Sequence, residues 1–133
     1  MLKRIGNYLG SKWSMRIMAF FYFIGGINHF ISPGFYLPLI PPAFPKPELI
    51  NTLSGLAEII LAIGLVNIKT RKLASYGIIL MLLAFIPAHV YFIQIGSCIG
   101  SGLCVAEWIG WFRLVVIHPA LLLWAWFAGK SSS

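Results

Sequence analysis

Four long apolar runs, each poor in charged residues, constrain this chain more than any other feature. They cover about residues 16–32, 48–66, 73–95 and 108–127. As α-helices with a rise of 1.5 Å per residue they would be about 25–35 Å long, which suits a hydrocarbon core of about 30 Å. Continuous apolar runs, in place of strict alternation, favour helices over a transmembrane β-barrel. The sequence therefore predicts an all-α membrane protein, a bundle of four transmembrane helices.

Charged residues make up only 10% of the 133 residues, compared with about a quarter in a typical soluble domain. The net charge of +7 is carried by lysines and arginines in short clusters beside the apolar runs. We therefore attribute this charge to membrane topology and expect no nucleic-acid partner. We expect a single membrane domain, residues 1–133, in contact with the lipid bilayer.

The stretch from Gly25 to Pro47, GGINHFISPGFYLPLIPPAFPKP, joins the first two apolar runs. Proline donates no backbone hydrogen bond and pushes the preceding residue out of the α region. The stretch cannot be helical throughout. We predict a structured proline-rich outer loop that covers one mouth of the bundle.

The distribution of basic residues predicts the orientation in the membrane, because lysine and arginine in short loops favour the cytoplasmic side. With four spans, one side collects Lys3, Arg4, Lys12, Arg16, Lys69, Arg71, Lys72 and Lys130, and the other side has Lys46, with Arg113 inside the last span. Both termini should be cytoplasmic, most simply in a bacterial cytoplasmic (inner) membrane. The proline-rich loop and the loop with both cysteines should share the outer face.

Five ionisable side chains fall within or at the edges of the spans, all in the outer half or near the midplane: His29, Glu58, His89, Arg113 and His118. A charge near the bilayer centre costs about 2.5–3.5 kcal/mol, so such groups usually face the bundle interior and pair with one another.

Glycines predict how some of these groups meet. Gly25 lies four residues before His29, and Gly55 lies beside Ser54, which is four residues before Glu58. Small residues at helical spacing let two helices approach closely, so the first two spans should bring His29 toward Glu58.

Arg113 is the natural counter-ion for Glu58. His118, five residues after Arg113, should point about 140° away on a regular α-helix. One interpretation is a structural Glu58–Arg113 ion pair that fixes the bundle register. The other is a pocket that binds a ligand or handles protons. A metal site of His29, His89 and Glu58 is disfavoured, since no motif with metal-ligand spacing is present.

The two cysteines, Cys98 and Cys104, fall in the same predicted outer loop. Facing an oxidising compartment, they would form a structural disulfide. A redox-active pair and two free thiols are the alternatives, although the spacing differs from the redox motif with two intervening residues.

Several segments together resemble the DoxX-like family of small membrane proteins. They are the run from Phe21 to Pro47, LSGLAEIILAIGL, TRKLASYG and FIPAHVYF, so the resemblance covers roughly residues 20–95. Arg113 and Leu114 resemble the start of a family Arg-Leu-Pro-Leu-Gln stretch, but Val115 and Val116 replace its continuation. The cysteine loop also departs from the family pattern.

The resemblance implies a four-helix membrane bundle. Some members of that family are subunits of membrane oxidoreductases that pass electrons to quinone. Carried over by position, the pocket residues would be His29, Tyr36, Glu58, His89 and Arg113. Fold-level likeness alone gives them no catalytic role.

Three functions follow as hypotheses. The first is an accessory or anchoring subunit of a membrane redox system with a quinone pocket, and therefore with a protein partner in the membrane or a second copy. The second is a non-enzymatic assembly factor or chaperone for partner helices. The third is a proton-coupled small transporter acting through Glu58. A nucleophilic hydrolase is disfavoured because the chain has no Asp and no G-x-S-x-G motif.

Overall fold

The computed structural model describes residues 1–100 and 102–131 and is all-α, as predicted. The long helices are α2 (Lys12–Ile31), α4 (Pro47–Val66) and α5 (Arg71–Gln94). A further continuous helix is built of α6 (Glu107–Phe112), the π-helical turn η2 (Arg113–Ile117) and α7 (His118–Lys130). Shorter elements are α1 (Leu2–Leu9), α3 (Pro33–Tyr36) and the 3-10 turn η1 (Leu37–Leu39).

Three of these helices are long and apolar enough to cross a membrane, namely Pro47–Val66, Arg71–Gln94 and Glu107–Lys130. They correspond to the predicted runs 48–66, 73–95 and 108–127. The first predicted run, 16–32, lies in α2, which has 20 residues but carries Arg16, Asn28 and His29. Among the described residues, length and composition thus identify three candidate spans where the sequence predicted four.

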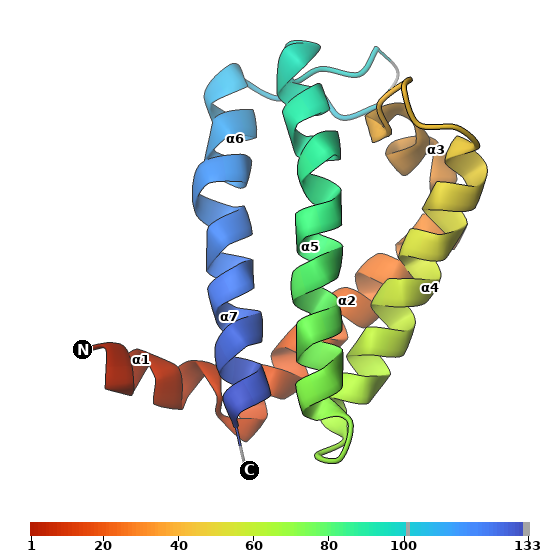
Figure 1. The fold of residues 1–133 in the computed structure, drawn as a ribbon. Helices are drawn as coiled ribbons and strands as arrows, with labels where there is room; N and C mark the ends of the chain where they lie inside the picture. The colour runs from red at the N-terminus through yellow and green to blue at the C-terminus, as the bar shows by residue number, and fades with distance from the viewer. Residues whose placement is uncertain (101, 132–133) are drawn as a thin grey trace.

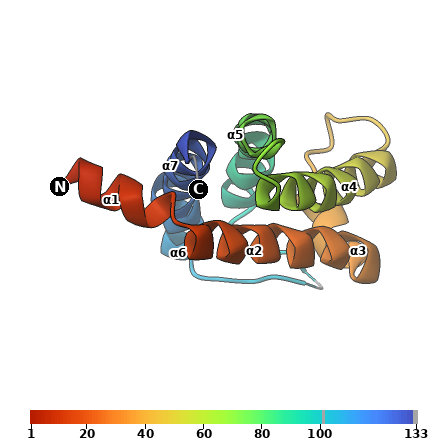
Figure 2. The ribbon, with the colours of Figure 1, turned by 90° about the horizontal axis from the view of Figure 1, so that it is seen from below.

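The three candidate spans stand side by side, and α2 crosses obliquely behind them (Figure 1). Seen from below, α2 lies along one face of this layer and continues into α3, while α1 extends sideways past α7 (Figure 2). The proline-rich segment and the loop between α5 and α6 meet at one end of the molecule. The N-terminus, the described C-terminal end and the loop between α4 and α5 lie at the other (Figure 1). We call this second end the basic end.

The hydrophobic core occupies the half of the molecule toward the basic end. It joins the beginning of α2 and of α5 to the last turns of α4 and of α7, through Met15, Met18, Ala19, Tyr22, Ala62, Leu65, Ala74, Ile78, Met81, Leu82, Ala125 and Ala128. Two polar contacts reinforce it: the Trp124 indole donates to Ser14 Oγ at 2.7 Å, and the Ser75 hydroxyl donates to the Ala125 carbonyl. The buried apolar side chains are thus concentrated in the half toward the basic end.

Glycines set the distance between α2 and α4. A Cβ on Gly26 would lie 2.7 Å from the Gly55 carbonyl oxygen, and one on Gly55 would lie 2.8 Å from His29 Cβ. Real Cβ atoms do not approach other atoms this closely, so only glycine fits at either position. The close approach predicted from the glycine spacing is therefore present.

The ends of the spans are fixed by local contacts. Arg71 is buried at the start of α5, and its side chain donates to the carbonyls of Leu65 and Val66, which end α4 without helical partners. At the opposite end, Cys98 and Cys104 form a disulfide within the loop between α5 and α6. The loop positioned by this bond lies at the same end as the proline-rich segment (Figure 1).

Candidate functional site

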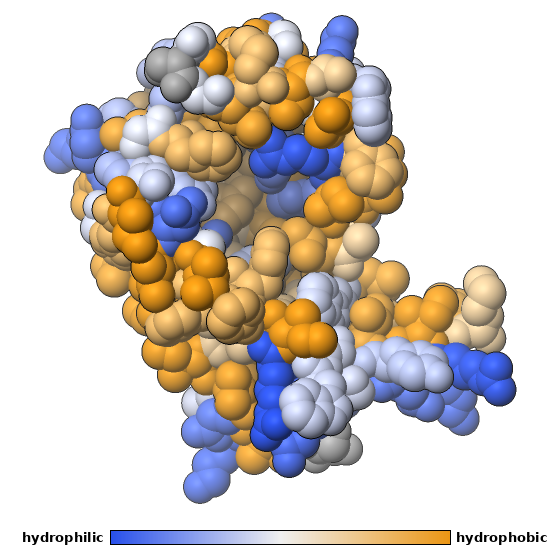
Figure 3. All heavy atoms as spheres, turned by 180° about the vertical axis from the view of Figure 1, so that it is seen from behind, coloured by the Kyte–Doolittle hydropathy of each residue, from blue (hydrophilic) through white to orange (hydrophobic). Residues whose placement is uncertain are grey.

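A cavity of about 790 Å³ occupies the half of the molecule away from the basic end. Helices α2, α4, α5 and α7 form its walls, with η2 and the proline-rich segment. Tyr22 and Leu82 belong both to its lining and to the core, so the core forms its floor. From behind, the surface is hollowed in its upper half, with hydrophilic side chains at the rim of an otherwise hydrophobic face (Figure 3). Its volume lies within the usual range for ligand pockets.

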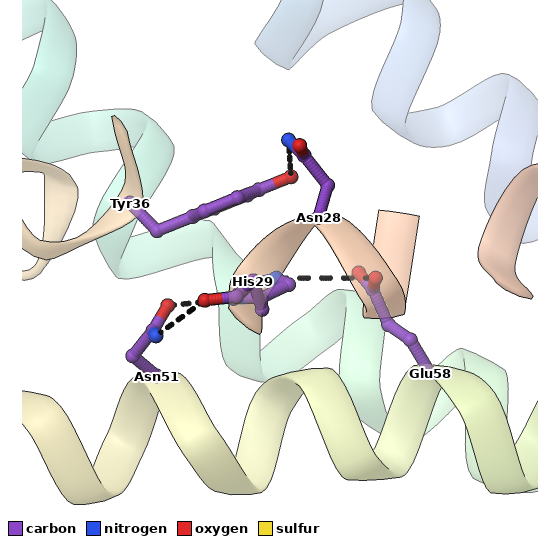
Figure 4. A network of polar contacts seen from close by, with 5 residues as sticks. All are labelled: Asn28, His29, Tyr36, Asn51 and Glu58. Carbon is purple, nitrogen blue, oxygen red and sulfur yellow. Dashed lines mark hydrogen bonds and ion pairs between the residues drawn. The ribbon is translucent and has the colours of Figure 1, made fainter. Parts of the chain in front are cut away.

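His29, near the end of α2, is held by Asn51 of α4. His29 Nδ1 lies 2.7 Å from Asn51 Oδ1, and Asn51 Nδ2 donates to the His29 carbonyl oxygen at 3.0 Å (Figure 4). Because the amide oxygen can only accept, His29 must carry a proton on Nδ1. The reciprocal pair is buried and fixes both the tautomer and the orientation of the imidazole. It leaves Nε2 free to face Glu58.

Glu58 is buried in the middle of α4 and is 8% exposed. Its Oε2 lies 3.8 Å from His29 Nε2, an ion-pair contact when the imidazole is protonated (Figure 4). No hydrogen-bond donor in the described part of the chain reaches Oε2. A Cβ on Gly25 would lie 2.9 Å from this oxygen, so the glycine leaves the room that the carboxylate occupies.

The proline-rich segment covers the cavity, as the sequence predicts. Tyr36, at the end of α3, stacks on the His29 ring with centroids 3.7 Å apart and planes inclined by 19°. Its hydroxyl accepts a hydrogen bond from Asn28 Nδ2 at 2.9 Å (Figure 4). Phe35, Leu39, Ile40, Pro41 and Phe44 of the same segment also line the cavity.

The opposite wall carries Arg113, His89 and His118, all of which line the cavity. The rings of His89 and His118 meet edge to face, with centroids 4.9 Å apart. His118 is buried, and its Nε2–H donates to the Leu82 carbonyl at 2.6 Å.

The prediction that Arg113 and His118 point in different directions is wrong. The His118 amide donates to the Arg113 carbonyl, five residues earlier, which is the hydrogen bond of a π-helix. Pro119 explains this local change, since its ring displaces the carbonyl four residues earlier and it has no N–H to donate. In a π turn, residues five apart lie nearly above one another. Arg113 and His118 therefore face the same cavity.

The predicted Glu58–Arg113 ion pair is also absent: within the described residues, the acid–base contact of Glu58 is the one with His29. The Arg113 guanidinium instead lies over the Phe92 ring, 5.4 Å from its centroid. The reason is geometric, because the glycine contact brings α2 to α4 while η2 stands on the far wall of the cavity. The basic group in contact with Glu58 is therefore His29, on the nearer helix α2.

All five predicted pocket residues, His29, Tyr36, Glu58, His89 and Arg113, line this one cavity. Sequence reasoning did not identify Asn28, Asn51 and Tyr22. Asn51 carries a usable signal, since it lies seven residues before Glu58 on the buried face of α4. Tyr22 is 3% exposed and its hydroxyl, like Glu58 Oε2, receives no hydrogen bond within the described residues.

The cysteines and metal-binding groups lie outside this arrangement. Cys98 and Cys104 do not line the cavity in the part of the chain that the structure describes. Nor do three or more His, Cys, Asp or Glu side chains gather there in a way that would hold a metal ion. The polar groups that line the cavity are imidazoles, phenols, carboxamides, one carboxylate, one guanidinium and the Ser54 hydroxyl.

Comparison with known families places the chain in one of them. Residues 18–129 match the model of a family described as a domain of unknown function, DUF8561. No curated protein and no solved structure matches the chain. The matched region begins in α2 and ends in the last turn of α7, so it contains every cavity residue except Ile17. The chain belongs to the DUF8561 family.

Proposed function

We propose that this protein is a small DoxX-like integral membrane protein that binds a quinone in its cavity, as an accessory or anchoring subunit of a membrane redox system. One observation carries the proposal. Two buried polar atoms, Glu58 Oε2 and the Tyr22 hydroxyl, belong to residues that line a mostly apolar cavity, and neither has a hydrogen-bond partner among the described residues. A buried polar atom of this kind needs a partner, and a ligand is one source.

The route into the cavity favours a lipid-soluble ligand. Phe20, Phe21 and Ile24 of α2 line the cavity and are 68%, 55% and 48% exposed. On the other side Ile117, at the end of η2, lines it and is 42% exposed. An apolar entrance on the face that contacts the bilayer admits a molecule dissolved in lipid and disfavours an ionic solute.

The polar residues fit a quinone head group. When bound, a quinone accepts two electrons and two protons. The Arg113 guanidinium is a fixed donor for a carbonyl oxygen, and His89 stands on the same wall. On the other wall, Glu58 can hold a proton at Oε2, beside His29, whose tautomer Asn51 fixes. The electrons would come from a protein partner in the membrane.

We also propose that α2 is the fourth span. Its 20 residues are about 30 Å long, enough to cross the hydrocarbon core. Its polar residues Asn28 and His29 turn toward the cavity and α4 and not toward lipid. With four spans, the basic end is cytoplasmic and the cavity lies in the outer half of a bacterial cytoplasmic membrane.

Titration of the purified, detergent-solubilised protein with a short-chain quinone tests the ligand. We expect the wild type to bind, and Glu58→Gln and His89→Ala to weaken binding by about tenfold or more, since the first removes the carboxylate that can hold a proton and the second removes the imidazole. Glu48→Gln is the matched control, because Glu48 lies in the first turn of α4, outside the cavity. Binding that is unchanged in both cavity variants would argue against a quinone pocket.

A further inference from the structure

A second pocket, of about 600 Å³, lies at the basic end, between α1, the start of α2 and the end of α7. Three lysines from three different helices line it: Lys3, Lys12 and Lys130. Gly6, Asn7, Gly10, Ser11, Phe127 and Ser131 complete the lining. We call this the lysine pocket.

Two glycines build the lysine pocket by bringing α1 against α7. A Cβ on Gly6 would lie 2.7 Å from the Phe127 ring, and one on Gly10 would lie 3.2 Å from the Phe127 carbonyl oxygen. Lys130, in the last turn of α7, is held over the Trp126 ring with its Nζ 4.4 Å from the centroid. Defined helix contacts therefore place the three lysines around one pocket.

The basic end has no carboxylate side chain to balance these charges. The chain contains three acidic residues, and all lie elsewhere. Glu48 and Glu107 begin α4 and α6 at the opposite end, and Glu58 faces the main cavity. Lysines that line one pocket without an acidic partner there attract an anion from outside the chain.

The start of α2 strengthens this attraction. Ser11 caps the helix by accepting a hydrogen bond from the Ser14 amide at 3.2 Å. The amides of Lys12 and Trp13, in the first turn, have no helical carbonyl to bind. The N-terminus of a 20-residue helix thus adds a partial positive charge to the lining of the same pocket.

We propose that the lysine pocket binds a phosphate-bearing anion. Its place at the membrane surface, in the four-span arrangement, suits the head group of an acidic phospholipid, while free phosphate has the same chemistry. The site is separate from the quinone cavity, and it would hold α1 against the bundle through the anion. It stands whether or not the main cavity binds a quinone.

Calorimetric titration of the full chain in a neutral detergent tests this site with three ligands: short-chain phosphatidylglycerol, short-chain phosphatidylcholine and inorganic phosphate. We expect phosphatidylglycerol to bind well and the zwitterionic phosphatidylcholine poorly. The triple variant Lys3→Gln, Lys12→Gln, Lys130→Gln should bind phosphatidylglycerol on the order of a hundredfold more weakly, at roughly fivefold for each lysine. Asn7→Trp fills the pocket without changing charge and should also abolish binding.

The matched control is the triple variant Arg4→Gln, Lys69→Gln, Lys72→Gln. It removes the same charge from the same end of the molecule, but none of these residues lines the pocket. It should retain most of the affinity, because a lysine that lines the pocket attracts the anion more strongly than a charge outside it, which solvent and salt screen. Inorganic phosphate binding as tightly, with the same dependence on the variants, would support the site and assign it to a soluble ion. Equal loss in both triple variants, unchanged binding in Asn7→Trp, or no binding by any ligand would overturn the proposal.

Discussion

Asn51 determines how the two ionisable residues of the α2–α4 contact, His29 and Glu58, can act. Its amide bonds both the ring and the carbonyl of His29, so the imidazole presents Nε2 to Glu58 in a single tautomer. Without Asn51 the His29 ring could rotate, and the ring atom and tautomer presented to Glu58 would no longer be fixed. The chemistry of the Glu58 carboxylate therefore depends on a neutral residue that does not contact it through a hydrogen bond.

The first prediction concerns this residue. Asn51→Ala leaves the buried His29 Nδ1–H and the His29 carbonyl without their partner, which should lower the free energy of unfolding by about 1–3 kcal/mol. Denaturant titration in mixed micelles measures this change. The control is the neighbouring Thr52→Ala, whose exposed hydroxyl donates to the Glu48 carbonyl of its own helix. It should change stability by no more than about 0.5 kcal/mol. Equal stability of the two variants would contradict the structural role of Asn51.

At the scale of the helices, the glycine contact between α2 and α4 decides which polar groups meet. Its counterpart on the far wall is the π turn η2, which brings Arg113 and His118 to one face. The glycine contact and the π turn are both local departures from ordinary helix geometry. The glycines shorten the distance between two helices, and Pro119 changes the rotation along one helix.

Gly26→Ala tests the helix contact. The added Cβ would lie 2.7 Å from the Gly55 carbonyl, a backbone atom that cannot move aside, so the helices must separate. We expect a loss of about 1–3 kcal/mol in the free energy of unfolding, as for other overpacked sites. Gly34→Ala is the control, because nothing lies within 4 Å of its added Cβ. It should be neutral or slightly stabilising, by up to about 1 kcal/mol. Similar losses in both variants would show that the contact does not limit helix approach.

At the scale of the whole molecule, the two ends differ in charge, packing and covering. The basic end is closely packed and holds the core, whereas the other end holds the main cavity, the disulfide and the proline-rich cover. The proposed four-span arrangement would place these ends on opposite sides of the membrane. The cavity would then open toward the outer leaflet and the lysine pocket toward the inner surface.

Single cysteines introduced into a Cys98→Ser, Cys104→Ser background test this topology. In intact cells a membrane-impermeant maleimide should label Gly34→Cys, in the outer cover. It should label Lys69→Cys, between α4 and α5, and Asn7→Cys, in α1, only after lysis. Lys69→Cys controls for the crossing of α4, which the three candidate spans already include. Labelling of Asn7→Cys from outside would show that α2 does not cross.

Much of this fold could be read from the sequence because its causes are local. Long apolar runs must be helical in lipid, and three of them are candidate spans whose ends lie within three residues of the predicted bounds. The prolines of the Gly25–Pro47 stretch break the helix wherever they stand, so the cover was predictable. Glycines spaced around His29 and Glu58 indicated the α2–α4 contact.

The contacts between side chains of different helices were decided by the tertiary structure alone, because they depend on the rotation of each helix and on the distance between helices. Hydrophobic periodicity is weak in spans that are apolar on every side, so it did not show which base would reach Glu58. The glycine contact gives it His29, while Arg113 remains on the far wall against Phe92. A single π turn reversed the predicted separation of Arg113 and His118. The sequence by itself determined which polar residues lie at one end of the molecule. Packing decided how these residues meet around the cavity, because a small change in helix rotation at one point turns every side chain that follows it.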